Sequence, residues 1–201
     1  TGNGFWKFEL LTDVVYTDTA GVTYSTVSGS AITLDNVTLT SSQSATLTVT
    51  SATDNPLAGN VIGSTSATTK VDVLKFNLKV ENVNTTLTSG TIKVTVDGSK
   101  VETSYVTALE LWDGSNLITS AAPTGWATAN GSSTATSTWT NFSLPIAAGT
   151  TKTLTVKAVL SQLPSGYTNN GNGYLQITTG PTLTGIDANS NVVSNTSTVT
   201  G

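Results

Sequence analysis

Apolar and polar residues alternate within residues 71–80, strictly so from Leu74 to Val80. Leu74, Phe76, Leu78 and Val80 alternate there with Lys75, Asn77 and Lys79. Successive side chains of an extended strand point to opposite faces, so this run predicts a strand with one buried and one solvated face. Shorter alternating runs recur at 45–49, 92–96 and 154–159. No stretch shows a sustained helical period, and the chain is therefore predicted to be all-β.

Turn signals separate these runs. Asp97-Gly98 and Asp113-Gly114 are dipeptides typical of β-hairpins. Thr makes up roughly one residue in five, and its β-branched side chain favours strands. Many short strands separated by turns predict an immunoglobulin-like antiparallel β-sandwich. Residues 121–137, rich in Ala, Thr, Ser and Gly, are predicted to form a long loop.

The two ends of the chain resemble each other. Residues 2–5 read GNGF and open a stretch that closes with STVSG at 25–29, whereas residues 171–174 read GNGY and open one that closes with STVTG at 197–201. Short matches also arise by chance in a chain this rich in Thr and Ser. A true duplication predicts one period of a repeating or polymerising β-structure. We therefore expect an extra N-terminal β-hairpin segment at 1–40, acting as a donor strand or ending a preceding module, and the sandwich at 41–201.

Several stretches also resemble a known kind of module. Residues 111–118 read LWDGSNLI, 146–158 read IAAGTTKTLTVKA, and 45–49 read ATLTV, followed by VLKFNL at 73–78. They are similar to the immunoglobulin-like modules of tandem bacterial and archaeal surface proteins, which include S-layer-like, adhesin-like and filament-forming chains. The resemblance covers residues 44–180 and implies an extracellular, cell-surface role. Val159 stands where such modules often carry Asp, so no role follows for an acid at that position.

Composition excludes several kinds of chemistry. The chain has no His and no Cys, which removes Ser-His-Asp and Cys-His nucleophilic sites and thiolate metal sites. A net charge of −4 argues against nucleic acid as a partner. No apolar run reaches membrane-spanning length, so no membrane insertion is expected. The acidic residues read as solvated turn and strand-face side chains, and we expect no enzyme activity.

One loop suggests a metal ion. Asp187, Asn189 and Asn191 have the D-x-N-x-N spacing of an oxygen-rich calcium loop. The Gly that should follow and the distal bidentate Glu are missing, and Asp and Asn also favour plain turns. Calcium is therefore the one cofactor hypothesis, and a metal-free turn is its alternative.

Two further kinds of site follow from single residues. Trp126 lies in the predicted loop, where nothing in the sequence buries it, and is a candidate contact for glycans. Five Asn-x-Ser/Thr sequons are candidate glycosylation sites in a secreted chain: Asn36, Asn84, Asn130, Asn141 and Asn195.

Three functions remain open at this point. The first is a non-enzymatic structural subunit of a surface filament or layer, assembling head-to-tail with identical subunits by β-strand complementation. Its expected anchors are Phe5, Trp6, Phe8, Leu10 and Val14. The second is one module of a covalent tandem stalk, contacting neighbouring modules. The third is an adhesin or carbohydrate-binding module that recognises host or cell-surface glycans. The absence of a visible signal peptide is expected for a mature chain or an excised segment.

Overall fold

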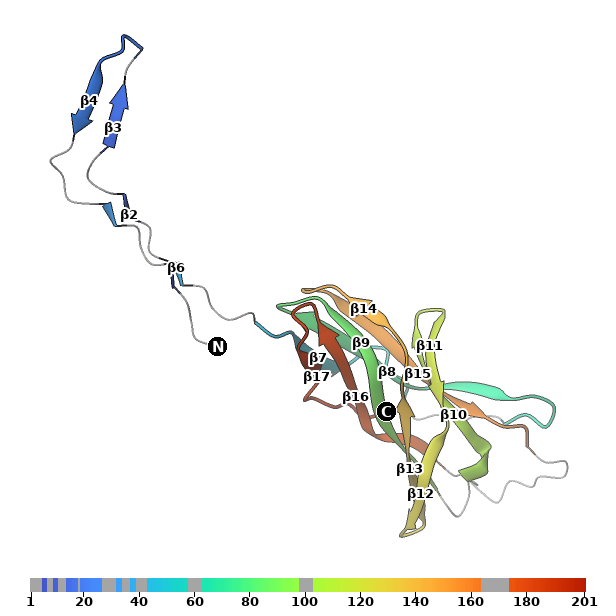
Figure 1. Ribbon diagram of the computed structural model, residues 1–201. Coiled ribbons are helices and arrows are strands. Elements are labelled where there is room, and N and C mark those ends of the chain that lie inside the picture. Colours follow the sequence, from blue (N-terminus) through green and yellow to red (C-terminus); the bar gives the residue numbers. More distant parts are fainter. Residues whose placement is uncertain are drawn as a thin grey trace. The chain divides into compact units, whose positions relative to one another are not determined.

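The computed structural model divides the chain into two compact units, Thr1–Gln43 and Ser44–Gly201 (Figure 1). It describes residues 5–6, 9–10, 14–17, 19–26, 32–33, 37–38, 43–57, 63–97, 103–163 and 174–201, and before residue 43 it describes side chains only at 19–22.

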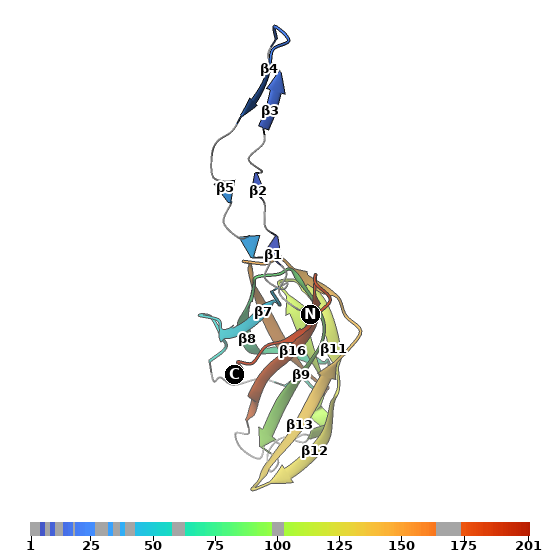
Figure 2. The same ribbon diagram turned by 60° about the vertical axis from the view of Figure 1, so that its left-hand side comes forward.

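The first unit is a two-stranded antiparallel ribbon (Figures 1 and 2). Its outgoing strands are β1 (Phe5–Trp6), β2 (Glu9–Leu10) and β3 (Val14–Thr17), and its returning strands are β4 (Thr23–Thr26), β5 (Ile32–Thr33) and β6 (Val37–Thr38). β1 pairs with β6, β2 with β5 and β3 with β4, so that Phe5 lies opposite Thr38 and Thr17 opposite Thr23. The turn between β3 and β4 contains Gly21 at φ 80°, a conformation that glycine adopts without strain. The expected N-terminal β-hairpin is thus confirmed.

The second unit is a sandwich of two antiparallel sheets. The first sheet has five strands in the order β11-β10-β15-β8-β7. Its bounds are β7 (Thr46–Ser51), β8 (Thr69–Glu81), β10 (Val106–Asp113), β11 (Asn116–Ala121) and β15 (Thr151–Leu160). The second sheet has six strands in the order β12-β13-β9-β16-β17, with β14 also paired to β9. Its bounds are β9 (Thr85–Asp97), β12 (Pro123–Ala129), β13 (Ser132–Trp139), β14 (Leu144–Ile146), β16 (Leu175–Asp187) and β17 (Val192–Ser194).

This strand order is that of an immunoglobulin-like sandwich. β7, β8, β15 and β10 occupy the positions of strands A, B, E and D on one sheet, and β9, β16 and β17 those of C, F and G on the other. The extra strands lie between D and E in the sequence and lengthen both sheets on one side. The predicted all-β, immunoglobulin-like fold class is therefore confirmed, as is the strand expected at 71–80, which forms most of β8.

The core lies between the two inner faces. Leu74, Phe76, Leu78 and Val80 are fully buried, as their alternation predicts. Trp139 on β13 is also fully buried and donates a hydrogen bond from its indole Nε1 to the Leu109 carbonyl on β10, 2.9 Å away. Because a buried indole N–H needs a partner, this bond satisfies the polar end of the largest core side chain while tying one sheet to the other.

The region predicted as a loop at 121–137 is instead the β12–β13 hairpin, and that prediction was wrong. Asn130 and Gly131 at its tip have φ values of 50° and 79°, the left-handed pair of a tight hairpin turn. Apart from Trp139 at its end, the residues of β13 that point inward are small ones, Ser133, Ala135 and Ser137, so the strand lacks the apolar alternation that identifies β8. A short 3₁₀ turn at Thr103–Tyr105 precedes β10. Within the ranges the structure describes, no helix is long and apolar enough to cross a membrane.

Candidate functional site

Residues 195–201, here called the closing segment, continue β17 along β16. The Asn195 amide donates to the Leu183 carbonyl at 3.3 Å, and Gly201 and Ile177 exchange two backbone hydrogen bonds of 3.2 and 3.3 Å. These contacts keep the register of β16–β17, in which Thr184 lies opposite Ser194. Antiparallel pairing thus occurs near both ends of the chain: Ser25 and Thr26 lie on β4, and Ser197 follows β17.

The closing segment also contacts the first sheet. The Ser197 hydroxyl accepts a hydrogen bond from the Val49 amide and donates one to the Val49 carbonyl, both at 3.0 Å. Val49 lies on β7, the edge strand of that sheet. One hydroxyl thus satisfies a donor and an acceptor of an edge strand that would otherwise need another strand or water. Val199, further along the segment, is half-buried against the core.

Two glycines make room for this close approach. A Cβ at Gly180 would lie 2.0 Å from the Val199 carbonyl oxygen, and a Cβ at Gly201 would lie 2.1 Å from the carbonyl oxygen of Val73 on β8. Real Cβ atoms do not approach other atoms this closely, so both positions require glycine for the segment to fit. The end of the segment consequently lies beside β16 and β8 together (Figure 2).

Asn195 fixes the start of the segment. Its side-chain Oδ1 accepts from the Leu183 amide at 2.6 Å, and its Nδ2 donates to the Pro181 carbonyl at 2.9 Å and the Ser197 carbonyl at 2.6 Å. The side chain is buried and its hydrogen-bonding groups are engaged. In the folded chain this sequon therefore presents no free amide.

The remaining sequons have different surroundings. Asn84, Asn130 and Asn141 are exposed, the last two at positive φ in turns, whereas Asn36 lies outside the described residues. Asn84 accepts a hydrogen bond from the Ala148 amide through its side-chain oxygen, 2.8 Å away. Glycosylation of these residues stays a prediction.

The Asp187 carboxylate is a hub of hydrogen bonds. Its Oδ1 accepts from the amides of Asn189 and Asn191, both at 2.9 Å, and its Oδ2 accepts from the Ala45 amide at 3.1 Å and the Asn191 side chain at 3.1 Å. Burial by itself raises the pKa of Asp187, but the hydrogen bonds from Asn191, Ala45 and Asn189 outweigh it and lower that pKa below the usual value. The carboxylate therefore holds the β16–β17 turn and joins it to the start of β7.

This arrangement gives the predicted calcium loop another role. Asn189 and Asn191 donate to Asp187 through N–H groups, where a calcium site would direct oxygens towards the ion. Within the described ranges, no cluster of three or more acidic, His or Cys side chains is placed to hold a metal ion. Calcium binding at this loop stays a prediction, and the geometry accounts for all three residues without it.

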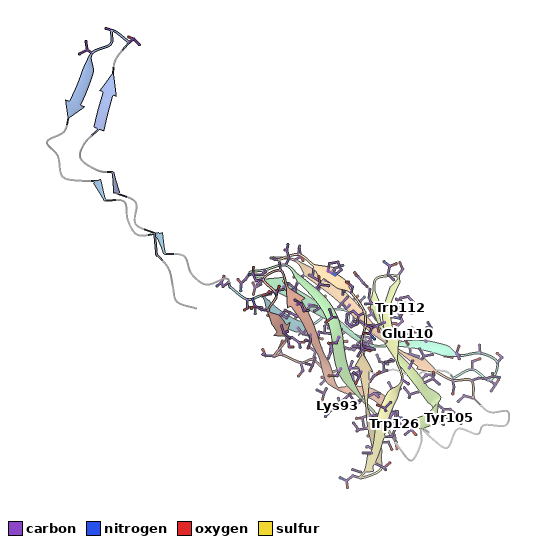
Figure 3. The ribbon with its side chains drawn as sticks, in the orientation of Figure 1. Lys93, Tyr105, Glu110, Trp112 and Trp126 are labelled. Carbon is purple, nitrogen blue, oxygen red and sulfur yellow. The ribbon has the colours of Figure 1, made fainter. Side chains whose placement is uncertain are left out.

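Trp126 is not exposed on a loop. It lies on β12 and packs, half-buried, against the core (Figure 3). The pairing of β12 with β13 shifts register between Thr124 and Ala127, and Gly125 at φ 72° forms this bulge. The extra residue of the bulge turns the Trp126 ring towards the other sheet. Packing therefore explains this residue, and the glycan contact proposed for it stays a prediction.

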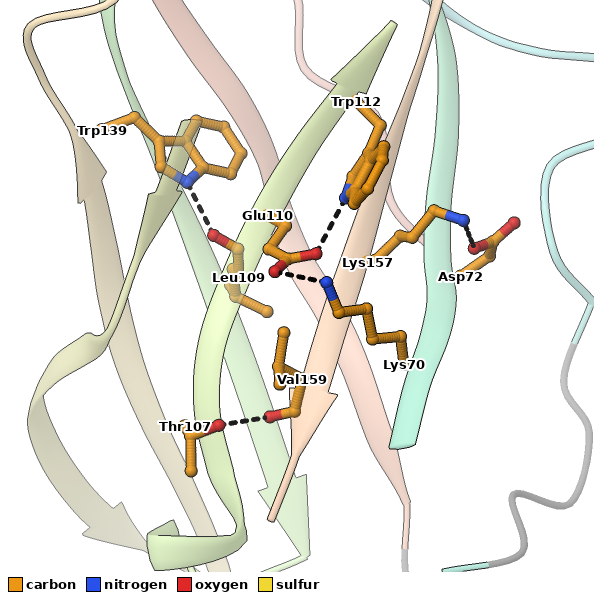
Figure 4. A network of polar contacts seen from close by, with 9 residues as sticks. All are labelled: Lys70, Asp72, Thr107, Leu109, Glu110, Trp112, Trp139, Lys157 and Val159. Atoms are coloured by element: carbon orange, nitrogen blue, oxygen red, sulfur yellow. Dashed lines mark hydrogen bonds and ion pairs between the residues drawn. The ribbon is translucent and has the colours of Figure 1, made fainter. Parts of the chain in front are cut away.

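Trp112 lies on the outer face of the first sheet and belongs to a polar network that the sequence did not suggest (Figure 4). The Glu110 side chain is buried and accepts from Lys70 Nζ and from the Trp112 indole Nε1, both at 2.9 Å. The ammonium groups of Lys70 and Lys157 each lie 5.2 Å from the centroid of the Trp112 ring, within cation–π range. Lys157 also pairs with Asp72 at 3.1 Å.

Ion pairs cover the rest of this face. Lys75 pairs with Asp54, Lys79 with Glu81 and Lys152 with Asp113. The side-chain hydrogen bond from Lys75 lowers the pKa of Asp54 below its usual value. The outer face of the second sheet is different, because hydroxyl groups dominate it: Thr95 bonds to Thr134 at 2.8 Å and to Thr178 at 3.0 Å across neighbouring strands.

A shallow, open depression of about 660 Å³ lies at the end of the second sheet. Thr86, Thr88, Pro145, Ile146 and Ile186 line it together with Asp187. Asp187 is its one carboxylate, and both oxygens of that carboxylate accept hydrogen bonds from the protein. A hydrolytic site needs a second acid or base across the cleft, and the lining of this depression supplies none.

The residues predicted to anchor a subunit contact belong to the ribbon. Phe5 and Trp6 lie on β1, Leu10 on β2 and Val14 on β3, whereas Phe8 lies outside the described residues. The structure describes the backbone of these strands and not these side chains. Their role as anchors stays a prediction.

Comparisons with protein-family models, curated proteins and solved structures find no match for this chain.

Proposed function

We propose that this chain is a non-enzymatic structural subunit of an extracellular, cell-surface filament or layer, and that its copies join head-to-tail by β-strand complementation. The observation that carries the proposal is that the first unit has only two-stranded pairing: each of its described strands has a single partner strand. An isolated two-stranded hairpin is at best marginally stable in water and needs a third strand or a packing surface. A neighbouring copy of the sandwich supplies such a surface through its sheet edges.

The sandwich offers what an incoming strand requires. β7 and β11 are the edges of the first sheet, and β12 is one edge of the second. Edge strands present unpaired N–H and C=O groups that template another strand. Because the donated ribbon and the receiving edge lie on different units of the chain, the contact is heterologous, and its repetition builds an open polymer.

The chemistry of the described residues supports a structural role over catalysis. Asp54, Asp72, Glu81, Glu110 and Asp113 each pair with a lysine. Asp187 is engaged in its turn, and among the described residues that line the depression beside it there is no second acid. Side chains held in ion pairs on a sheet face stiffen a surface rather than activate a substrate.

The test compares the full chain with a variant lacking residues 1–40, which removes all the described strands of the ribbon, from β1 to β6. Light scattering and electron microscopy follow both at equal concentration. We expect polymers from the full chain and monomers from the truncated one. Stable monomers from both would contradict complementation by the ribbon.

The covalent tandem stalk remains the second candidate, because hairpins of the same kind at both ends also suit modules joined end to end. In that case adjacent modules exchange strands within one polypeptide. A two-module chain would then bury its linking hairpin without polymerising, whereas the filament proposal predicts that single modules polymerise.

A further inference from the structure

The closing segment lies in a site between β7 and β16, here called the seat, which contacts three of its residues on one face. The Ser197 hydroxyl bonds to both backbone groups of Val49, and the Val199 side chain packs on the core. Gly201 lies against Val73, where there is no room for a side chain. These residues are two apart and share the inward face of the segment. Thr198 and Thr200 alternate with them and are exposed.

The same three-residue code occurs once more in the chain. Ser25, Val27 and Gly29 repeat the spacing of Ser197, Val199 and Gly201, and no other stretch of the 201 residues has Ser-x-Val-x-Gly. Ser25 lies on β4, the returning strand of the ribbon. Residues 25–29 therefore carry the same side chains, at the same spacing, as those that make the contacts of the closing segment.

The closing segment is held in a way that allows replacement beyond Asn195. Its described backbone hydrogen bonds to β16 lie at its two ends, at Asn195 and Gly201, while Pro181 on β16 lacks an N–H group between them. Ser197 bonds to β7 through its side chain instead of through a backbone ladder. Releasing residues 197–201 breaks six described hydrogen bonds: two at the Ser197 hydroxyl, two at the Gly201 backbone, and one each at the carbonyls of Ser197 and Thr200. All six use backbone groups or a serine hydroxyl of the segment, so a strand with the same Ser-x-Val-x-Gly residues can restore each of them.

We infer that residues 25–29 of a second copy take the seat between β7 and β16 by displacing residues 197–201 of the first. This inference rests on the proposed function and names its contact. In a free subunit the closing segment then fills the seat, and it competes with the incoming strand for that site. Asn195 is the limit of the exchange, because the ribbon has Thr23 two residues before Ser25 and that side chain cannot make the three hydrogen bonds of Asn195.

A pair of valine substitutions one residue apart tests the donor. Gly29→Val adds side-chain atoms at the position equivalent to Gly201, where the seat has no room, whereas Ser28→Val adds them at a position equivalent to the exposed Thr200. In the full chain, we expect Gly29→Val to slow polymer growth by about tenfold or more, as overpacking does, with the melting temperature of the monomer unchanged. Ser28→Val should polymerise like the unmodified chain.

The matching pair tests the closing segment. Gly201→Val places a Cβ 2.1 Å from the Val73 oxygen and so weakens the closing segment without altering the seat. We expect a lower melting temperature for its monomer and polymer growth that is about tenfold faster, because the competing segment has been weakened. Thr200→Val should change neither quantity.

The outcomes separate the two proposals. If the full chain forms no polymer, or if the variant lacking residues 1–40 polymerises equally well, the proposed function fails. If growth depends on residues 1–40 but Gly29→Val and Ser28→Val grow alike, the ribbon docks elsewhere and only the present inference fails. Slower growth of Gly201→Val would make the closing segment part of the interface rather than its competitor, and would equally overturn the inference.

Discussion

At the scale of single residues, Asp187 shows how a loop that resembles a metal site is held by the protein itself. Its pKa is lowered in the folded chain from the ordinary value of 3.8. A carboxylate with a lowered folded pKa contributes stability above its unfolded pKa, and that contribution is lost as pH falls through the folded value. We therefore predict that the melting temperature falls as the pH drops below 3.8, with Asp187 responsible for part of the fall.

Asp187→Asn should lower the melting temperature at neutral pH by about 5 °C, because amides that now donate to a carboxylate lose a charged acceptor. Its melting temperature should also depend less on pH in the acid range. The control is Asp72→Asn, which removes a half-exposed ion-pair partner and should change little. Differential scanning calorimetry with and without calcium completes the test: calcium-dependent melting that Asp187→Asn abolishes would establish the metal site after all.

Glu110 is a second residue whose role is set by its contacts. Its two carboxylate oxygens face donors, the Lys70 ammonium and the Trp112 indole N–H. In Glu110→Gln, the side-chain NH₂ group would replace one of the two acceptor oxygens and face either the Lys70 ammonium or the Trp112 indole N–H. Two donors would then face each other at a buried position, at a cost of about 1–3 kcal/mol. Urea denaturation should resolve that loss, whereas Glu81→Gln, at a more exposed ion pair, should fall within about 0.5 kcal/mol of the unmodified chain. Equal effects of the two variants would contradict a structural role for the network.

At the level of elements, apolar alternation made β8 predictable, and its absence hid β13 and the extended closing segment. The inward residues of β13 and of the closing segment are mostly Ser, Ala and Gly, which bury little apolar area and read as loop composition. Period-two alternation of Leu109 and Leu111 was visible, however, and it places Glu110 and Trp112 together on the opposite face. The partner strand that supplies Lys70 could not be read from one sequence, because strand neighbours depend on topology.

The β12–β13 hairpin depends on its turn more than on its side chains. Gly131 at φ 79° adopts a conformation that costs a β-branched residue about 1–3 kcal/mol. Gly131→Val should therefore destabilise the sandwich by that amount in urea denaturation. Gly131→Asn is the matched variant, because Asn tolerates left-handed conformations and should lose less. Losses of equal size would place the cost in packing instead of backbone conformation.

At the level of the whole molecule, the proposed function assigns folding to the second unit and association to the first. The described core runs from Ala45 to Val193, entirely within the second unit. A sandwich that contains its own core should fold without the ribbon, so residues 44–201 alone should melt cooperatively within about 2 °C of the full-length monomer. Scanning calorimetry at concentrations below polymerisation measures both.

The same measurement bears on how the ribbon is used. A ribbon docked on its own sandwich would add buried area in cis, and deleting it would lower the melting temperature by more than that margin. It would then also be unavailable to a neighbour until it detached, and assembly would be limited by that step. An unchanged melting temperature would mean that the ribbon does not dock on its own sandwich. Its strands, each with one partner, would then be free to pair with a neighbouring copy. A two-stranded element that gains its third strand only by association makes polymer formation and ribbon folding a single event.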